Sequence, residues 1–117
     1  MPTPIPTLRL RLILDTHRAL GPGKIDLLDA IAGTGSITAA ARVMRMSYKR
    51  AWQLIDDLNH CFAAPLVAAS KGGEHGGGAE LTQTGQRVLD VYRSIERKAG
   101  KSLAVELRQL ARLRDKS

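Results

Sequence analysis

The chain has 117 residues, of which 18 are Lys or Arg and 11 are Asp or Glu, so its net charge is +7. This length supports one domain with a modest core and excludes a catalytic domain joined to a separate sensor, while the basic charge favours a polyanionic partner, nucleic acid before an acidic membrane surface. The lone cysteine, Cys61, excludes an intrachain disulfide, and without a long uncharged apolar run we expect no membrane span and a cytoplasmic protein.

The N-terminal part reads as a proline-rich lead followed by a strand and a helix. Residues 1–7 lack the basic and apolar regions of a signal peptide, and we expect them to be disordered. From Leu8 to Leu12, leucine and arginine alternate strictly, which predicts a half-buried strand. Gly21-Pro22-Gly23 then breaks the chain before a helix predicted from about Lys24 to Gly33. The apolar face expected on this helix comprises Ile25, Leu28, Ile31 and Ala32.

The stretch from Ser36 to Phe62 reads as two helices joined by a tight turn. Ser36 and Ser47 are the expected N-caps, because a serine hydroxyl accepts hydrogen bonds from the free N–H groups of a first helical turn. Met44-Arg45-Met46 is only long enough for a corner between them. Apolar residues recur at helical spacing on the second helix, and we expect Trp52 to be the largest contributor to the core. This predicted apolar face comprises Ala51, Trp52, Ile55, Leu58 and Phe62.

The other side of the second helix is polar and basic near its start. No acidic residue occurs from Ala30 to Ile55, so the positive field is expected to peak here. A short helix, a turn and a longer helix with hydroxylated, basic and amide residues at its start indicate a helix-turn-helix that reads the DNA major groove. The outward residues predicted on the second helix are Ser47, Tyr48, Lys49, Arg50 and Gln53.

The signals change from helix to strand after Phe62. Leu66–Ser70 and Ala79–Leu81 are predicted to be strands, separated by a segment with five glycines in eight positions. Two short strands directly after a recognition helix indicate the wing of a winged helix, whose tip meets the DNA backbone or minor groove. A phosphate-cradling loop is disfavoured because no Gly-Lys-Ser/Thr follows, and a plain flexible linker stays open as an alternative.

A long helix is predicted from Thr82, its expected cap, to the C-terminus. Its apolar stripe exceeds what this small domain can cover, so we expect it to pair with the same helix of a second copy. The alternatives are packing on its own core or a frayed tail, since Gly100 weakens the middle by about 1 kcal/mol relative to alanine. The predicted fold is therefore mainly α with a small β wing: a winged helix-turn-helix over residues 8–82 and a dimerisation helix over 83–117. The expected dimer contacts are Tyr92, Ile95, Ala99, Leu103, Leu107 and Leu110.

Three stretches, residues 20–37, 40–59 and 76–85, resemble the N-terminal DNA-binding domain of ModE-type molybdate-responsive transcriptional regulators. The most specific parts run from Met46 to Trp52 and through the glycine-rich segment to Leu81-Thr82, whereas the segment around Ser36 is shared with LysR-type regulators. The resemblance implies a dimeric winged helix-turn-helix that binds a palindromic operator, often as a repressor of molybdate uptake genes. In that family molybdate is held by C-terminal domains, so we expect neither a molybdate site nor a cofactor within residues 1–117.

Roles for the polar side chains follow from the donor and acceptor pattern of base edges. Lys49 or Arg50 is the candidate for guanine O6 and N7, and Gln53 for adenine N6 and N7. Ser36 and Thr38 complete the expected DNA-binding set. The residues expected to hold phosphates are Ser47, Tyr48, Arg42, Arg45 and Lys71.

Few residues support a catalytic or metal-binding function. His17, His60, His75 and Cys61 are the only metal-binding or nucleophilic groups of their kinds, and no metalloprotease, nucleophile-elbow or Cys-x-x-Cys motif contains them. We therefore expect no catalytic or metal site. A winged-helix module that binds another protein remains the alternative, although such a module more often has an apolar or acidic face on its second helix.

Overall fold

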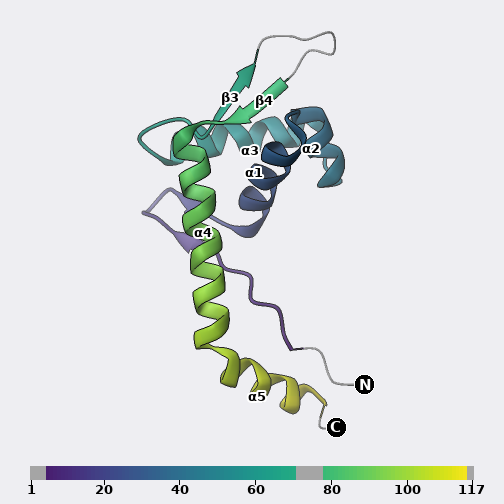
Figure 1. The fold of residues 1–117 in the computed structure, drawn as a ribbon, viewed down its shortest axis with the longest axis vertical. Coiled ribbons are helices and arrows are strands. Elements are labelled where there is room, and N and C mark those ends of the chain that lie inside the picture. The colour runs from purple at the N-terminus through teal and green to yellow at the C-terminus, as the bar shows by residue number, and fades with distance from the viewer. Residues whose placement is uncertain (1–4, 71–77, 116–117) are drawn as a thin grey trace.

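The computed structural model describes residues 5–70 and 78–115. Helices α1, α2 and α3 and a β-hairpin form a head, from which α4 extends as a stalk, and α5 turns away at its far end (Figure 1). The molecule is mainly helical, and a two-stranded wing follows the helix-turn-helix, which confirms the predicted fold class. The elements are β1 (Leu12–Ile13), β2 (Ala19–Leu20), α1 (Pro22–Thr34), α2 (Ile37–Val43), α3 (Tyr48–Cys61), β3 (Val67–Ser70), β4 (Gly78–Leu81), α4 (Gln83–Ser102) and α5 (Ala104–Asp115).

Helix α1 lies at the centre of the head. It contacts α2, α3, α4 and β4, so it is buried over a wider arc than its apolar spacing predicted. Leu27 is fully buried, and the prediction that Ala32 belongs to the apolar face is wrong because Ala32 is exposed. The buried residues of α1 are Ile25, Leu27, Leu28 and Ile31.

Side-chain hydroxyls cap the three helices predicted to have them. The Ser36 hydroxyl accepts from the Ala39 N–H at 3.1 Å and the Ser47 hydroxyl from the Arg50 N–H at 3.0 Å. Thr82 caps α4 in the same way. All three predicted N-caps are therefore confirmed, because each depends only on residues within one helical turn.

The core of the head corrects two predictions about aromatic residues. Trp52 is 39% exposed, so it is not the main core side chain; Leu54 and Cys61 are buried in α3 instead. Tyr92 is 1% exposed and is the largest fully buried side chain, and its hydroxyl donates to the Leu10 carbonyl. The expectation that Tyr92 forms dimer contacts is wrong, because its ring packs inside its own chain.

The N-terminal segment forms less strand than its alternation predicted. Only Leu12–Ile13 pairs, antiparallel to Ala19–Leu20, which is too short a partner to extend the ladder. The alternation still describes burial, since the leucines from Leu8 to Leu12 are half-buried and the arginines between them are exposed. Residues 1–4 of the predicted disordered lead lie outside the described residues.

The predicted wing strands pair as an antiparallel hairpin, β3–β4. Its register runs from Val67 opposite Leu81 to Ser70 opposite Gly78. A bridge joins Ser36 to Gly78, so the end of β4 nearest the tip is attached to the start of α2. The tip, with Lys71 and His75, lies outside the described residues.

Asn59 and Gly85 fix the hairpin against the helices. The Asn59 side-chain oxygen accepts from the Leu66 and Val67 N–H groups at 2.9 and 3.0 Å, which joins α3 to the start of β3. Gly85 allows α4 to approach the Leu66 backbone, since a Cβ at this position would lie 2.0 Å from the Leu66 oxygen. The Thr82 N–H also donates to that oxygen at 2.9 Å. The angle at which α4 leaves the head is therefore set by backbone contacts.

The predicted continuous C-terminal helix is wrong. The helix is interrupted at Leu103, whose φ of −103° and ψ of 11° are not helical. A separate helix, α5, begins at Ala104. Arg93 fixes the near half of the stalk to α1 through ion pairs with Asp26 at 3.1 Å and Asp29 at 3.0 Å. Among the described residues, no helix is both long and apolar enough to cross a membrane.

Candidate nucleic-acid interface

The turn between α2 and α3 is closed by two backbone hydrogen bonds. The Met46 N–H donates to the Ala41 carbonyl at 3.0 Å, and the Arg45 N–H donates to the Arg42 carbonyl at 3.1 Å. This pairing is a Schellman motif, which requires a left-handed residue one position after the helix C-cap. Arg45 occupies that position with a φ of 56°, where glycine is usual. The motif places the exposed Arg45 side chain at the corner that precedes α3.

Helix α3 exposes two rows of side chains opposite its buried face. Lys49 and Gln53 are four residues apart and therefore share one face of the helix. Tyr48 and Trp52 form a second row beside the first, with the same spacing. Ala51, Leu54 and Ile55 are buried beneath them. The predicted outward residues Ser47, Tyr48, Lys49, Arg50 and Gln53 are all exposed, so the head does not cover them.

The charge on the outward face changes sign along α3. Its first turns carry Lys49 and Arg50, whereas Asp56 and Asp57 are exposed about two turns later. His60 lies near Asp56, with 3.6 Å between Nδ1 and the carboxylate oxygen. These acidic residues were not part of the predicted interface, although their spacing of three and four from Gln53 identifies their face. They leave only the first two turns of α3 attractive to an anionic backbone.

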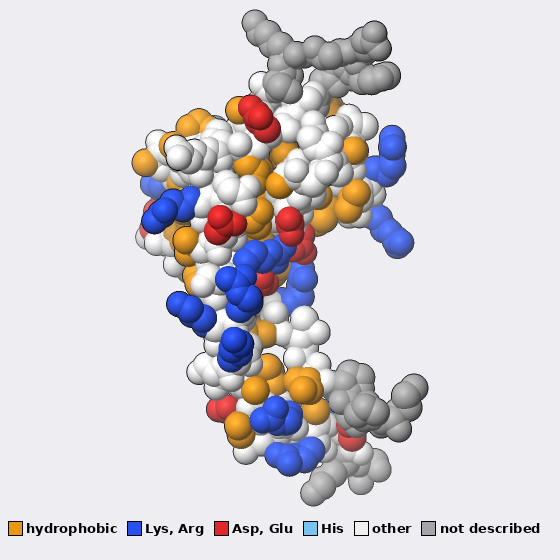
Figure 2. All heavy atoms as spheres, in the orientation of Figure 1, with side chains coloured by type: hydrophobic (Ala, Val, Ile, Leu, Met, Phe, Trp, Pro, Cys, Tyr) orange, Lys and Arg blue, Asp and Glu red, His pale blue; other side chains and the backbone are white. Residues whose placement is uncertain are grey.

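The remaining expected DNA contacts lie around α2. Thr38 is exposed in its first turn and Arg42 in its last. Ser36 is half-buried, and its side-chain oxygen is engaged as the cap of α2, next to the start of β4. Arg42 and Arg45 therefore lie at the end of α2 that leads into α3. Ser36 and Thr38 lie at the opposite end of α2. Figure 2 shows Lys and Arg side chains projecting from the α2 side of the head and along α4 and α5.

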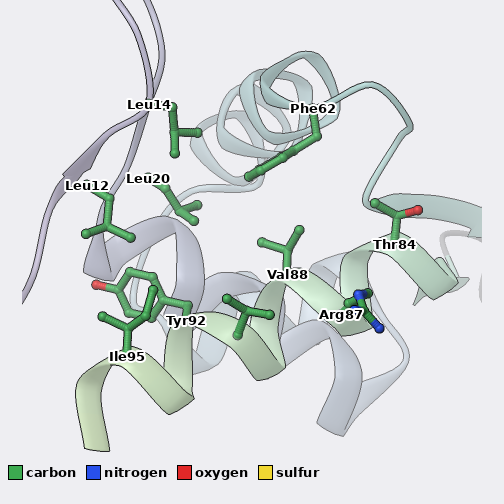
Figure 3. Close-up of a pocket in the computed structure, with 10 residues that line it drawn as sticks. Leu12, Leu14, Leu20, Phe62, Thr84, Arg87, Val88, Tyr92 and Ile95 are labelled. Atoms are coloured by element: carbon green, nitrogen blue, oxygen red, sulfur yellow. The ribbon is translucent and has the colours of Figure 1, made fainter. Parts of the chain in front are cut away.

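An apolar hollow of about 360 Å³ lies where β1 and β2, the end of α3 and helix α4 meet (Figure 3). Ile95, one of the expected dimer contacts, lines it, and Val91 beside it is 51% exposed. Farther along, Ala99 and Leu107 are half-buried, while Leu103 and Leu110 are 38% and 56% exposed. The residues lining the hollow are Leu12, Leu14, Leu20, Phe62, Thr84, Arg87, Val88, Val91, Tyr92 and Ile95.

The described histidine and cysteine side chains do not form a metal-binding cluster. Cys61 is buried, with its Sγ 4.0 Å from the Ala19 carbonyl oxygen. Across residues 5–70 and 78–115, no group of three His, Cys, Asp or Glu side chains is placed to hold a metal ion.

A protein-family model matches more than half of the chain. Residues 23–86 fit the model of bacterial regulatory helix-turn-helix proteins of the lysR family. These residues run from the start of α1 to the start of α4, and so include the turn, α3 and the wing.

Curated relatives match over the same part of the chain. The molybdenum transport protein ModE of Azotobacter vinelandii is 44% identical over 88 residues, which is 75% of this chain and 33% of that protein. The DNA-binding transcriptional dual regulator ModE of Escherichia coli (strain K12) is 42% identical over 83 residues, which is 71% of this chain and 32% of that protein. The chain therefore spans about a third of the length of these relatives.

A solved structure shares the fold. In the crystal structure of a CbnR_DBD–DNA complex, one chain superposes with a TM-score of 0.58 at 26% identity, covering 75% of this chain and 94% of that one. The shared part is more than half of the present molecule, and the matching chain comes from a complex with DNA.

Proposed function

This chain belongs to the bacterial regulatory helix-turn-helix proteins of the lysR family, and from this premise we propose that it is a transcriptional regulator that binds duplex DNA sequence-specifically. The observation that carries the proposal is the exposed, basic start of α3, which presents Lys49, Arg50 and Gln53 together, while the exposed acidic residues of the helix begin only at Asp56. Side chains of these kinds match the donor and acceptor pattern of major-groove base edges. The proposed place of action is the cytoplasm, where bacterial DNA is accessible.

The geometry of α3 supports different roles for its two cations, one contacting a base and the other a phosphate. Lys49 shares a face with Gln53, so a groove deep enough to admit one side chain admits the other. We assign Lys49 to guanine and Gln53 to adenine. Arg50 follows Lys49 at the edge of this face and is assigned to a phosphate. The other proposed phosphate contacts are Arg42, Arg45, Ser47 and Lys71, with Ser36 and Thr38 meeting the backbone on the wing side.

Binding as a homodimer is part of the proposal. Apolar side chains from α4 to α5, Val91, Leu103 and Leu110 among them, are exposed, and Val91 lines the hollow together with Ile95. Two copies paired there would present two α3 helices to half-sites about 34 Å apart, one turn of B-DNA. A palindromic operator follows from that symmetry.

The physiological target is proposed from the resemblance to molybdate-responsive regulators. Repression of molybdate uptake genes is the proposed effect. We assign no molybdate ligand within residues 1–117.

The test compares two single variants on two kinds of DNA. Fragments bound by the protein are selected from genomic DNA, and affinities for a selected and a random duplex are measured at two salt concentrations. Phosphate-driven binding weakens steeply with salt. Lys49→Ala is expected to cost about 1–3 kcal/mol on the selected duplex and much less on the random one, whereas Arg50→Ala weakens both alike.

Two outcomes would count against this scheme. If Arg50→Ala lowers only the affinity for the selected duplex, Arg50 and Lys49 exchange roles. If the wild-type protein binds neither duplex at low salt, the DNA-binding proposal fails and the protein-interaction module takes its place.

A further inference from the structure

Two aromatic rings lie exposed on the first two turns of α3. Tyr48 and Trp52 are 49% and 39% exposed. Their ring centroids are 6.2 Å apart and their planes meet at 84°, an edge-to-face contact. The chain has only four aromatic residues, one Trp, two Tyr and one Phe, so half of them stand on this one helix surface. Aromatic rings are costly to leave in water, and an exposed pair therefore indicates a contact surface.

The surroundings of the pair indicate what it contacts. Tyr48 precedes Lys49 and Trp52 precedes Gln53, so the aromatic row runs directly beside the row proposed to read bases. The charged neighbours in this half of the helix are cations, and the first acidic residue is Asp56. A surface with this charge is complementary to a polyanion rather than to an acidic protein face. Any duplex that reaches Lys49 and Gln53 lies within reach of the indole.

The edge of a base pair in the major groove carries one prominent apolar group, the C5-methyl of thymine. Building on the proposed function, we infer that Trp52 reads thymine by apolar contact with this methyl group, and that Tyr48 is a positioning residue that holds the indole. The edge-to-face contact restricts the rotation of both rings, so little side-chain entropy is lost on binding. Lys49 and Gln53 read polar groups, and the aromatic pair adds discrimination between thymine and cytosine.

The first test removes the methyl group and leaves base pairing intact. Duplexes selected from a random-sequence pool by the wild-type protein are prepared with thymine or with uracil, and affinities are measured for wild type and Trp52→Ala. Each contacted methyl that is removed is expected to weaken wild-type binding about fourfold, the change for one buried methylene-sized group. Trp52→Ala is expected to bind both duplexes equally. Ile13→Ala, an exposed apolar change on β1, is the matched control and should keep the wild-type preference for thymine.

The second test needs no variant. Trp52 is the only tryptophan, so the intrinsic fluorescence of the wild-type protein reports on this side chain alone. Quenching by acrylamide is measured for the free protein and for the complex with the selected duplex, while the anisotropy of labelled DNA reports binding in the same sample. The quenching constant is expected to fall severalfold in the complex.

The outcomes separate this inference from the function on which it rests. If no duplex binds, the proposed function itself has failed. If duplexes bind while uracil and thymine give equal affinities, or while Trp52 stays as accessible to acrylamide as in the free protein, DNA binding stands and the thymine-reading role is overturned. Protection of Trp52 only at high protein concentration without DNA would assign the pair to contacts between copies and would also overturn it.

Discussion

Arg45 adopts a left-handed backbone conformation in which glycine is usual. Its φ of 56° lies in the left-handed region, which costs a residue with a Cβ about 1–2 kcal/mol. The Schellman motif fixes this conformation, because both of its hydrogen bonds close around Arg45. A cation at the corner before a proposed recognition helix explains why the cost is tolerated: the side chain is placed to meet a phosphate.

Arg45→Gly is expected to make the domain more stable and the DNA complex weaker. Relief of left-handed strain exceeds the added flexibility of the unfolded chain, so the free energy of unfolding rises by about 0.5–1 kcal/mol. Loss of the charge weakens binding to any duplex and lowers the salt dependence by about one phosphate contact. Thermal unfolding and DNA titrations at several salt concentrations measure the two effects.

Arg45→Ala is the control for that substitution, because it removes the charge and keeps the Cβ. It should weaken DNA binding as much as Arg45→Gly and gain no stability. Equal stability of the two variants would contradict the assignment of strain to this residue.

At the scale of elements, the junction between the wing and α4 depends on close backbone packing. Gly85 lies in the first turn of α4, directly against Leu66. The Thr82 hydroxyl both donates to the Pro65 carbonyl at 2.7 Å and accepts from the Gly85 N–H at 2.9 Å, so it fixes the same junction. The direction of the stalk is therefore coupled to the position of β3.

Gly85→Ala is expected to destabilise the protein by about 2–3 kcal/mol. The added methyl would overlap the Leu66 carbonyl oxygen, and backbone on both sides must shift to admit it. Thermal or urea unfolding measures the loss.

Gly100→Ala is the matched control. It lies in the same helix with open space around its Cβ position, so it should gain about 1 kcal/mol from helix propensity. Two variants of equal stability would show that α4 can move away from Leu66 at no cost.

At the scale of the whole molecule, the apolar side chains of the head are largely buried by the chain itself, whereas several of those on α4 and α5 are exposed. Tyr92 and Arg93 fix the first half of α4 to the head through the Leu10 carbonyl, Asp26 and Asp29. The pKa of Arg93 is raised by its hydrogen bond to Glu96, and further by Asp26 and Asp29, against the opposing effect of burial. Beyond the break at Leu103, apolar side chains such as Val105 and Leu110 are exposed.

Leu110→Glu is expected to weaken the proposed dimer at least tenfold. A carboxylate at an apolar contact must either be desolvated or hold the two copies apart. Sedimentation of the protein across a range of concentrations measures the effect, and binding to a palindromic duplex should weaken in parallel.

Gln109→Glu adds the same charge at the neighbouring exposed position and should leave dimerisation unchanged. A wild-type protein that sediments as a monomer at every concentration, and occupies a palindrome one copy at a time, would remove the dimer from the proposed function.

Local interactions determined much of the fold from the sequence alone. The caps at Ser36, Ser47 and Thr82 and the corner around Arg45 each depend on residues within a few positions of one another, and the two wing strands are consecutive elements of the chain; all are present. Helical spacing likewise identified the exposed start of α3, because a period of 3.6 residues assigns opposite faces without reference to any other element.

Only the tertiary structure decided where the buried arc of each helix ends. Trp52 lies at the flank of α3, beside Ala51 and Ile55, and periodicity alone does not say whether a flank is covered. Tyr92 belongs to a stripe that the sequence assigned to a second copy, yet Leu10, more than eighty positions earlier, accepts its hydrogen bond inside the same chain. The faces of a helix follow from its own residues, but what covers each face depends on the elements that pack against it.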